Sequence, residues 1–191
     1  QLSTGMAIVR LTGTLNRVMV VELGQGTSLV SLMLAIPLLL APARALIGYR
    51  SDHHRSYLGW RRIPYLWSGT LMQFGGLAFM PFALILMIEP HSGPPIIGPI
   101  AAMGSFLLTG LGMHVSQTAG LALATDLATE ETRPRVVALL YLMLLVGMIS
   151  SAVIFAALLD DFSYVRLIQV IQSAAVITLI LNVAAMWKQE V

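Results

Sequence analysis

Long apolar runs separated by short polar connectors dominate the chain. A helix needs about 20 mostly apolar residues to cross a bilayer, and the pattern therefore predicts an all-α membrane protein with six transmembrane helices in a single domain, residues 1–191. Arg10, Asn16 and Arg17 interrupt the first run, which therefore has the weakest apolar pattern of the six. The predicted spans are residues 2–23, 28–49, 64–88, 97–125, 135–159 and 164–187.

Composition agrees with this pattern. Hydrophobic residues make up 57% of the 191 residues and charged residues only 10%, against about 25% charged in a soluble domain. There is no cysteine, which excludes thiol catalysis and disulfides. The chain starts at Gln1, not at Met, and ends just after an apolar run. We therefore expect a fragment of a longer membrane protein, with lipids around it and no nucleic-acid partner.

The positive charges are distributed unequally between alternate connectors. Because Lys and Arg in short loops favour the cytoplasmic side, we expect the second and fourth connectors and both termini of this segment to be cytoplasmic. The first, third and fifth connectors carry only Arg166. The cytoplasmic set is Arg50, Arg55, Arg61, Arg62, Arg133, Arg135 and Lys188.

The second connector carries the densest charge, in the stretch GYRSDHHRSYLGWRRIP (48–64). Its order resembles the loop signature of the major facilitator superfamily, although the spacing between its aspartate and its second glycine is longer than in that signature. The resemblance implies close helix approach at the first glycine, an aspartate that meets an arginine or a helix N-terminus, and arginines that pair across the cytoplasmic face. The matching residues are Gly48, Asp52, Gly59, Arg61 and Arg62.

The fourth connector holds further candidate charge partners, which are Asp126, Glu130, Arg133 and Arg135. Its acids can form ion pairs with the arginines of the second connector and hold the cytoplasmic side of the bundle together. Alternatively, Glu130 and the residue after it stabilise the start of the fifth helix through the helix dipole. Both interpretations can hold at once.

Longer stretches resemble one branch of that superfamily, the PucC-type light-harvesting complex assembly proteins of purple phototrophic bacteria. The similar stretches include LTGTLNRVMVVELG, QTAGLALATDLATEETRPRVVALLYLMLLVGM and RLIQVIQSAAVITLILNVAAMWKQE. The resemblance runs from about residue 5 to residue 190 and matches the N-terminal half of a twelve-span protein. It implies a six-helix half-bundle built as a three-plus-three repeat, located in the inner or intracytoplasmic photosynthetic membrane.

The same resemblance implies a function in antenna assembly. The expected partners are light-harvesting antenna polypeptides, and in addition the reaction centre–antenna complex. Bacteriochlorophyll would be a bound or delivered pigment and not a covalent cofactor.

Polar residues inside the first helix form a candidate ligand site. At about 100° per residue, Arg10, Thr14 and Arg17 lie on one face, with Asn16 nearby. Ionisable groups within a span are functional hypotheses by default, and this stripe can line a cavity and bind an anionic or carbonyl group. Alternatively, one arginine extends to the interface or pairs with Glu22 or Asp126.

The fourth helix adds His114 and Gln117, which lie three residues apart on one face. A neutral imidazole can serve as axial ligand to the magnesium of bacteriochlorophyll. The alternative is a hydrogen bond to a polar group of the first helix, such as Asn16 or Thr14. No other metal site is expected.

No enzymatic motif is present: there is no P-loop, no glycine-rich dinucleotide turn and no HExxH. Two functions remain, an antenna assembly factor and a secondary transporter whose site would be Arg10, Arg17, His114 and Gln117. Proton-coupled carriers place a titratable carboxylate near the membrane centre. The acids Glu89 and Asp126 lie at the ends of spans two to six, which favours the assembly factor.

Overall fold

The computed structural model describes residues 1–54, 57, 59–88, 93–159, 162–187 and 189. Within these residues all the regular secondary structure is helical, and there is no strand. Arg55, Glu89 and Lys188, which entered the sequence analysis, lie outside the described residues.

The helical elements follow one another with short connections. The first segment consists of α1 (Leu2–Val9), η1 (Arg10–Thr14), α2 (Leu15–Arg17) and η2 (Val18–Glu22), where η denotes a π-helix. The longer elements are α3 (Thr27–Leu39), α4 (Ala43–His53), α5 (Ile63–Leu86), α6 (Ile97–Leu127), α7 (Arg133–Leu158) and α8 (Tyr164–Met186).

Five helices in the described residues are long and apolar enough to cross a membrane. They are Thr27–His53, which joins α3 and α4, together with α5, α6, α7 and α8. These five agree with the predicted second to sixth spans to within a few residues at each end. The first predicted span is helical over almost its whole length, but two π-helical turns interrupt it and it is not among the five.

The second predicted span, residues 28–49, is interrupted at its two prolines, as expected of a proline kink. Pro37 lies inside α3, and the helix stops at a turn that contains Pro42 before α4 begins. Proline removes a backbone donor and its ring clashes with the preceding turn, which explains the break. In addition, α4 continues to His53, so Arg50 and Asp52 lie on a helix and not in the predicted loop.

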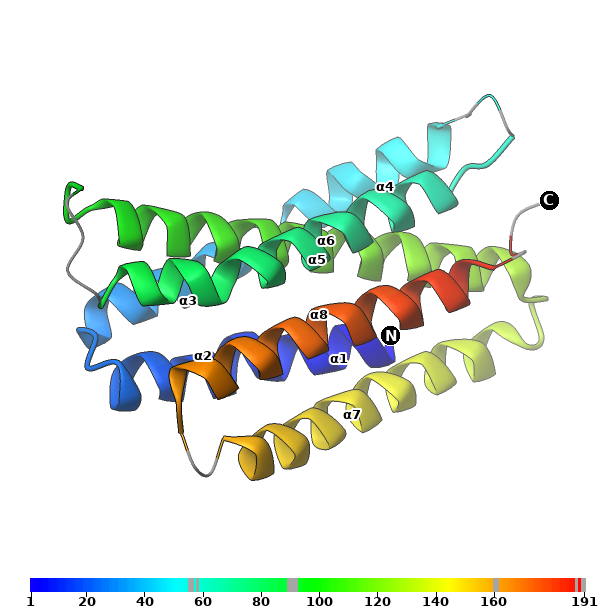
Figure 1. Ribbon diagram of the computed structural model, residues 1–191. Helices are drawn as coiled ribbons and strands as arrows, with labels where there is room; N and C mark the ends of the chain where they lie inside the picture. Colours follow the sequence, from blue (N-terminus) through cyan, green and yellow to red (C-terminus); the bar gives the residue numbers. More distant parts are fainter. Residues whose placement is uncertain (55–56, 58, 89–92, 160–161, 188, 190–191) are drawn as a thin grey trace.

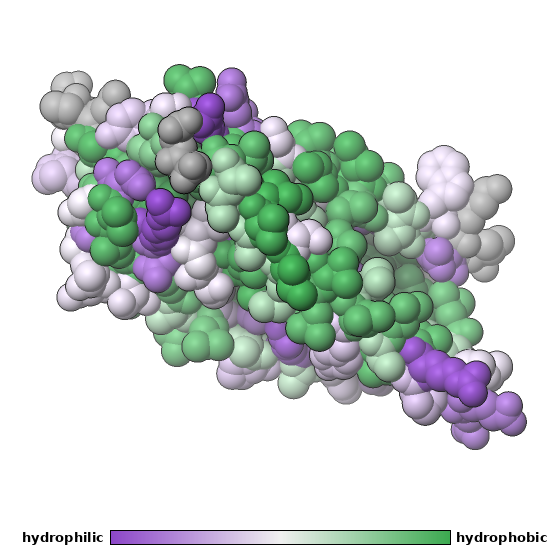
Figure 2. Space-filling view, turned by 90° about the horizontal axis from the view of Figure 1, so that it is seen from below, coloured by the Kyte–Doolittle hydropathy of each residue, from purple (hydrophilic) through white to green (hydrophobic). Residues whose placement is uncertain are grey.

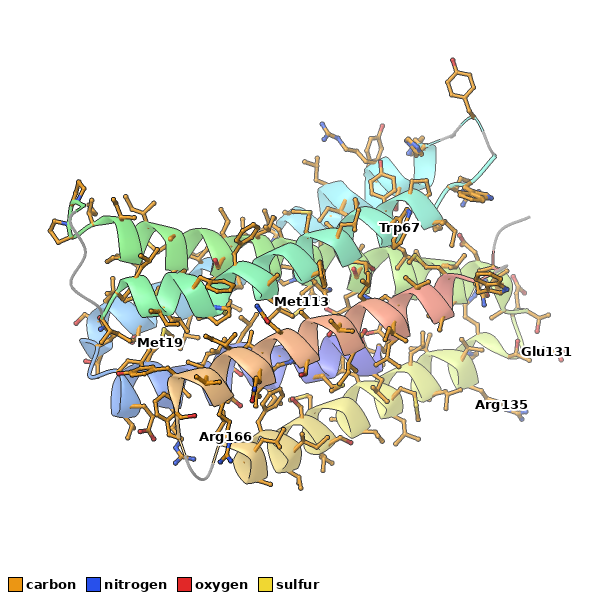
Figure 3. All side chains as sticks on the ribbon, in the orientation of Figure 1. Met19, Trp67, Met113, Glu131, Arg135 and Arg166 are labelled. Atoms are coloured by element: carbon orange, nitrogen blue, oxygen red, sulfur yellow. The ribbon has the colours of Figure 1, made fainter. Side chains whose placement is uncertain are left out.

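The long helices run alongside one another as a bundle (Figure 1). The α4–α5 and α6–α7 connections and the C-terminus lie at one end, and the connections that precede α3, α6 and α8 lie at the other. Glu131 and Arg135 mark the first end, whereas Arg166 marks the opposite end (Figure 3). The bundle therefore has the alternation of connectors that the charge pattern requires. Which end faces the cytoplasm stays a prediction.

Small residues allow the closest helix contacts. A Cβ added to Gly147 of α7 would overlap the backbone of Leu2, and one added to Gly5 would overlap the backbone of Leu144. The Ser151 hydroxyl donates a hydrogen bond of 3.2 Å to the Met6 carbonyl across the same contact. This close packing at Gly147 and Ser151 joins the first segment to α7.

Candidate functional site

At the end of the bundle predicted to be cytoplasmic, the Arg62 side chain joins three helices. Arg62 precedes α5, and its side chain is only 6% exposed. Its Nη1 forms an ion pair with Asp52 near the end of α4, and its Nε donates to Asp126 Oδ2 of α6 at 3.1 Å. Nη1 also donates to the Ser51 hydroxyl oxygen at 2.7 Å, and Ser51 in turn donates to the Gly48 carbonyl at 2.9 Å.

The electrostatics of this cluster keep Arg62 charged. Burial alone would lower the pKa of the Arg62 guanidinium, since desolvation disfavours a charge. Hydrogen bonds and charge attraction from Asp52 and Asp126 outweigh the burial, and the pKa lies above its ordinary value. The cation therefore persists at every physiological pH.

Three residues of the loop signature lie together in this cluster, namely Asp52, Arg61 and Arg62. Arg61 is about half exposed and reaches Asp126 Oδ2 at 3.3 Å. Gly59 has φ +79°, a left-handed conformation that favours glycine. The role expected for Gly48 is wrong, because a Cβ there would meet nothing nearer than Thr118 Cγ2 at 3.8 Å, an ordinary contact.

The remaining candidate charge partners lie apart from this cluster. Glu130, Arg133 and Arg135 are exposed, and none of them forms an ion pair with another described residue. The predicted pairing of this connector with the arginines of the second connector therefore involves Asp126 and not Glu130.

A second polar cluster lies within the bundle, on α6 where it faces α3 and α4. His114 is 4% exposed. Its Nδ1 accepts a hydrogen bond of 2.8 Å from Arg44 Nε, and its Nε2 lies 2.7 Å from the Pro37 carbonyl oxygen. Since a carbonyl only accepts, Nε2 carries the proton and the ring is neutral. Arg44 Nη2 also donates to Gln117 Oε1.

The break between α3 and α4 creates this arrangement. The Ala41 N–H bonds to the Leu38 carbonyl at 3.0 Å, which leaves the Pro37 carbonyl to accept from His114. Gly110 lies directly beneath Pro37, and a Cβ there would approach Pro37 Cβ to 2.5 Å. The break, the glycine and the histidine therefore fit together as one contact between α3 and α6.

Arg44 was missed by the sequence reasoning. It lies inside a predicted span, so the rule that selected Arg10 and Arg17, that ionisable residues within spans are functional candidates, also applied to it. Its partners could not be foreseen, because they are about 70 residues away in sequence.

The contacts of His114 bear on the pigment hypothesis. An axial ligand to magnesium must offer a free ring-nitrogen lone pair. Here Nδ1 accepts a hydrogen bond from Arg44, and the Nε2–H donates one to the Pro37 carbonyl. Neither nitrogen offers a free lone pair, so this arrangement does not fit a magnesium ligand. The alternative partners Asn16 and Thr14 are also wrong, because His114 bonds to α3 and α4 and not to the first segment.

The predicted stripe on the first segment is not formed. Arg10 is 2% exposed and donates at 3.0 Å to both the Met6 carbonyl and Thr178 Oγ1. Arg17 is 58% exposed and lies 3.9 Å from Glu22, as one of the alternatives expected. The π-helical turn η1 begins at Arg10 and ends before Arg17. It advances by a smaller angle per residue than an α-helix, which turns Arg17 away from Arg10.

The other two stripe residues do not complete a binding site. Thr14 lines a groove of about 220 Å³ with Arg17 and Glu22. Asn16 is half-buried and has no hydrogen-bond partner among the described residues. Arg10, Arg17 and His114 therefore belong to three separate environments and do not converge on one ligand.

A third polar chain, missed from the sequence, links the first segment to α8 and α5. Ser3 donates to Asn182 Oδ1 at 2.6 Å, and Asn182 Nδ2 donates to Thr70 Oγ1 at 3.1 Å. Asn182 was a visible signal, as an amide inside an apolar span that needs a partner. As for metals, the described residues contain no group of three His, Cys, Asp or Glu side chains that could hold an ion.

Comparisons with known proteins give the family. The model of the PUCC protein family matches residues 14–191. Two relatives called Protein PucC, from Rhodovulum sulfidophilum and Rhodobacter capsulatus, are 58% and 56% identical over 100% of this chain. A protein of Rhodobacter capsulatus named as a bacteriochlorophyll synthase 44.5 kDa chain is 27% identical over 98% of it.

The chain spans 42% of the length of each of these three relatives. No solved structure matches it. Because the family model and the two PucC relatives cover nearly all of its residues, the chain belongs to the PUCC protein family.

Proposed function

We propose that this chain is part of a membrane assembly factor for bacterial light-harvesting antenna complexes. It would bind antenna polypeptides, and it would present or deliver bacteriochlorophyll to them. The observation that carries the proposal is identity of 56–58% over the full chain with two proteins named PucC. Because the chain spans about two fifths of those relatives, the activity belongs to the longer protein.

The outer surface of α7 supports binding to other membrane polypeptides. Only Gly147, Ser151 and Phe155 of its 26 residues are buried. Apolar side chains cover the middle of the face that includes α7, while hydrophilic residues gather mainly toward the two ends (Figure 2). The exposed large side chains of α7 are Leu139, Tyr141, Leu142, Leu145, Val146, Ile149, Val153, Ile154 and Leu158. Such a surface suits lipid or a partner helix.

The helix contacts are compatible with a facilitator-type half-bundle. In a three-plus-three repeat the first span corresponds to the fourth and the second span to the fifth. A contact between the first and fifth spans should therefore recur between the fourth and second spans. The first segment packs on α7, and α6 packs on α3, so these two pairs are related as such a repeat requires. The repeat also relates the α5–α6 contact to the α1–α8 contact, but the first of these is much more extensive than the second. The repeat therefore stays part of the proposal.

The transporter alternative receives less support. Its candidate residues Arg10, Arg17 and His114 do not share a site. Within the described parts of α3 to α8, the acidic residues are Asp52 and Asp126, both near helix ends. A titratable carboxylate near the membrane centre, typical of proton-coupled carriers, is therefore missing from these helices. We propose a non-catalytic binding role.

The test is affinity purification of the intact protein from pigment-containing membranes. We expect antenna polypeptides and bacteriochlorophyll to co-purify, as seen by mass spectrometry and by the absorption of the eluate. An unrelated multi-pass membrane protein with the same tag is the control. Recovery of neither antenna polypeptide nor pigment above this control would overturn the proposal.

A matched pair of variants tests the pigment contact. His114→Ala and Gln117→Leu each remove one acceptor of Arg44, but only the first removes an imidazole. Because both ring nitrogens are engaged, we expect equal pigment in the two purified variants. Pigment lost in His114→Ala and retained in Gln117→Leu would instead identify His114 as a magnesium ligand.

A further inference from the structure

Arg44 carries a positive charge that no described residue neutralises. Its two hydrogen-bond partners, His114 and Gln117, are neutral. The ion pairs of the described residues involve other arginines. A guanidinium has five N–H donors, and the two bonds leave three without an acceptor among these residues. The remaining N–H groups of this half-buried cation are therefore available to an anion.

A cavity lies beside this side chain. It has a volume of about 250 Å³ and is lined by Arg44 of α4, by Gln117, Thr118 and Leu121 of α6, by Leu140 and Tyr141 of α7, and by the first residue of the chain. The lining combines one cation and several hydrogen-bonding groups with leucine side chains. Such a mixture suits a ligand that has an anionic group on an apolar body.

The depth of Arg44 agrees with an amphipathic ligand. Arg44 precedes Asp52 by eight residues on α4, and a helix rises by 1.5 Å per residue, which places Arg44 about 12 Å below the charged end of the bundle. The polar interface is about 5–8 Å thick on each side of the hydrocarbon core. This level therefore lies a few ångström inside the core, and Arg44 would hold the anionic group below the headgroups while its apolar body remains in the membrane.

The bonds to His114 and Gln117 also orient the guanidinium. Nε and Nη2 are held against α6, which directs the remaining donors away from these two side chains. Two parallel N–H groups of a guanidinium match the two oxygens of a carboxylate or phosphate. His114 and Gln117 are therefore positioning residues, and they leave the other donors of Arg44 available to a ligand.

We propose that the Arg44 cavity binds the carboxylate or phosphate group of an amphipathic membrane molecule. This site goes beyond antenna assembly and does not depend on it. Arg44 neutralises the anionic group, while Leu121 and Leu140 contact the adjoining apolar chain. The fatty-acid carboxylate and the phospholipid phosphate are two sources of the same chemistry, which separate probes distinguish.

The test measures binding to the intact protein in a neutral detergent by native mass spectrometry. The probes are oleate, phosphatidylglycerol and inorganic phosphate, with oleyl alcohol as the uncharged counterpart of oleate. We expect oleate or phosphatidylglycerol to bind at least about tenfold more tightly than oleyl alcohol, because a charge-assisted bidentate contact is lost with the alcohol. Which of the two binds identifies the source.

Arg44→Gln is the main variant, and Arg50→Gln is its matched control, because Arg50 is exposed on the same helix and outside the cavity. We expect Arg44→Gln to weaken binding of the anionic probe about tenfold or more, with Arg50→Gln unchanged. Equal binding by Arg44→Gln and the unmodified protein, or equal losses in both variants, would overturn the proposal.

A second variant addresses misfolding. Leu140→Trp fills the cavity from α7 and leaves the bonds of Arg44 to His114 and Gln117 intact. It should also abolish binding of the anionic probe while thermal unfolding stays near that of the unmodified protein. A folded Leu140→Trp protein that binds oleate and phosphatidylglycerol as before would contradict a site in this cavity. Antenna polypeptides that co-purify with such a variant would leave the assembly function standing.

Discussion

At the scale of single residues, the two glycines of the loop signature, Gly48 and Gly59, have different roles. Gly59 has φ +79°, a backbone conformation that costs a side-chain-bearing residue about 1–2 kcal/mol. Gly48 lies within α4, where an added Cβ has space and alanine favours the helix. We predict that Gly59→Ala destabilises the protein by about 1 kcal/mol, whereas Gly48→Ala is neutral or slightly stabilising.

Thermal unfolding of both variants in detergent, followed by circular dichroism, measures this difference. A larger loss of thermal stability in Gly48→Ala than in Gly59→Ala would contradict this prediction and would support close helix approach as the role of Gly48. The sequence signature treats the two glycines alike, and only the backbone angles separate them.

The two arginines of the signature also differ. Arg62 is 6% exposed and reaches two carboxylates and a hydroxyl, whereas Arg61 is 48% exposed. Hydrogen bonds to charged groups contribute about 1.5–3 kcal/mol when they are sheltered, and exposed pairs contribute about 0–1 kcal/mol. We therefore predict that Arg62→Gln lowers the unfolding free energy by about 2 kcal/mol, and Arg61→Gln by less than about 1 kcal/mol.

Denaturant titration of the two variants under identical detergent conditions provides the comparison. Arg62 should act in the same way across physiological pH, since its pKa is raised and its charge is lost only when the pH rises through that value. Equal losses in the two variants would show that burial of Arg62 does not matter.

At the scale of elements, glycine positions determine how closely helices approach. Gly147 of α7 packs against the backbone of Leu2, whereas a Cβ at Gly104 of α6 meets nothing within 4 Å. Overpacking a tight contact costs about 1–3 kcal/mol, while replacing an unconstrained helical glycine by alanine gains up to about 1 kcal/mol. We predict that Gly147→Ala destabilises the contact of the first segment with α7 and that Gly104→Ala stabilises α6.

Resistance of the two variants to unfolding in sodium dodecyl sulfate checks this prediction. A Gly147→Ala protein as stable as the unmodified one would mean that the first segment and α7 separate at little cost. Hydropathy identified both helices. The distance between them depends on backbone contacts that no residue pattern along one helix reveals.

The break in the second predicted span is another feature at the scale of elements. Pro37 and Pro42 were visible in the sequence, and a kink was an ordinary expectation. The carbonyl that the break frees is paired with a histidine 77 residues away. That pairing required α6 to lie beside α3, with Gly110 under Pro37.

At the scale of the whole molecule, the charge pattern predicts which end of the bundle is cytoplasmic. Because the chain has no cysteine, single cysteines can report topology if any cysteines elsewhere in the longer protein are replaced. Gly26→Cys lies in the first connector, where a Cβ has free space, and Glu130→Cys lies in the fourth, where the side chain is exposed.

In intact spheroplasts, a membrane-impermeant maleimide should label Gly26→Cys directly. It should label Glu130→Cys only after the inner membrane is opened. The reverse pattern would invert the topology, and labelling of both sites in spheroplasts would remove one of the proposed membrane crossings between them.

The sequence alone determined the helical class, the approximate ends of five spans, the alternation of charged connectors and the family resemblance. These follow from local properties, because a run of apolar residues sets the length of a span and its flanking charges set the side. Only the tertiary structure decided that Arg62 is buried between two carboxylates, that Arg10 and Arg17 point apart, and that Arg44 and Pro37 meet His114. The physical reason is that helix rotation, π-helical turns and glycine contacts bring distant residues together, and hydropathy contains no information on any of them.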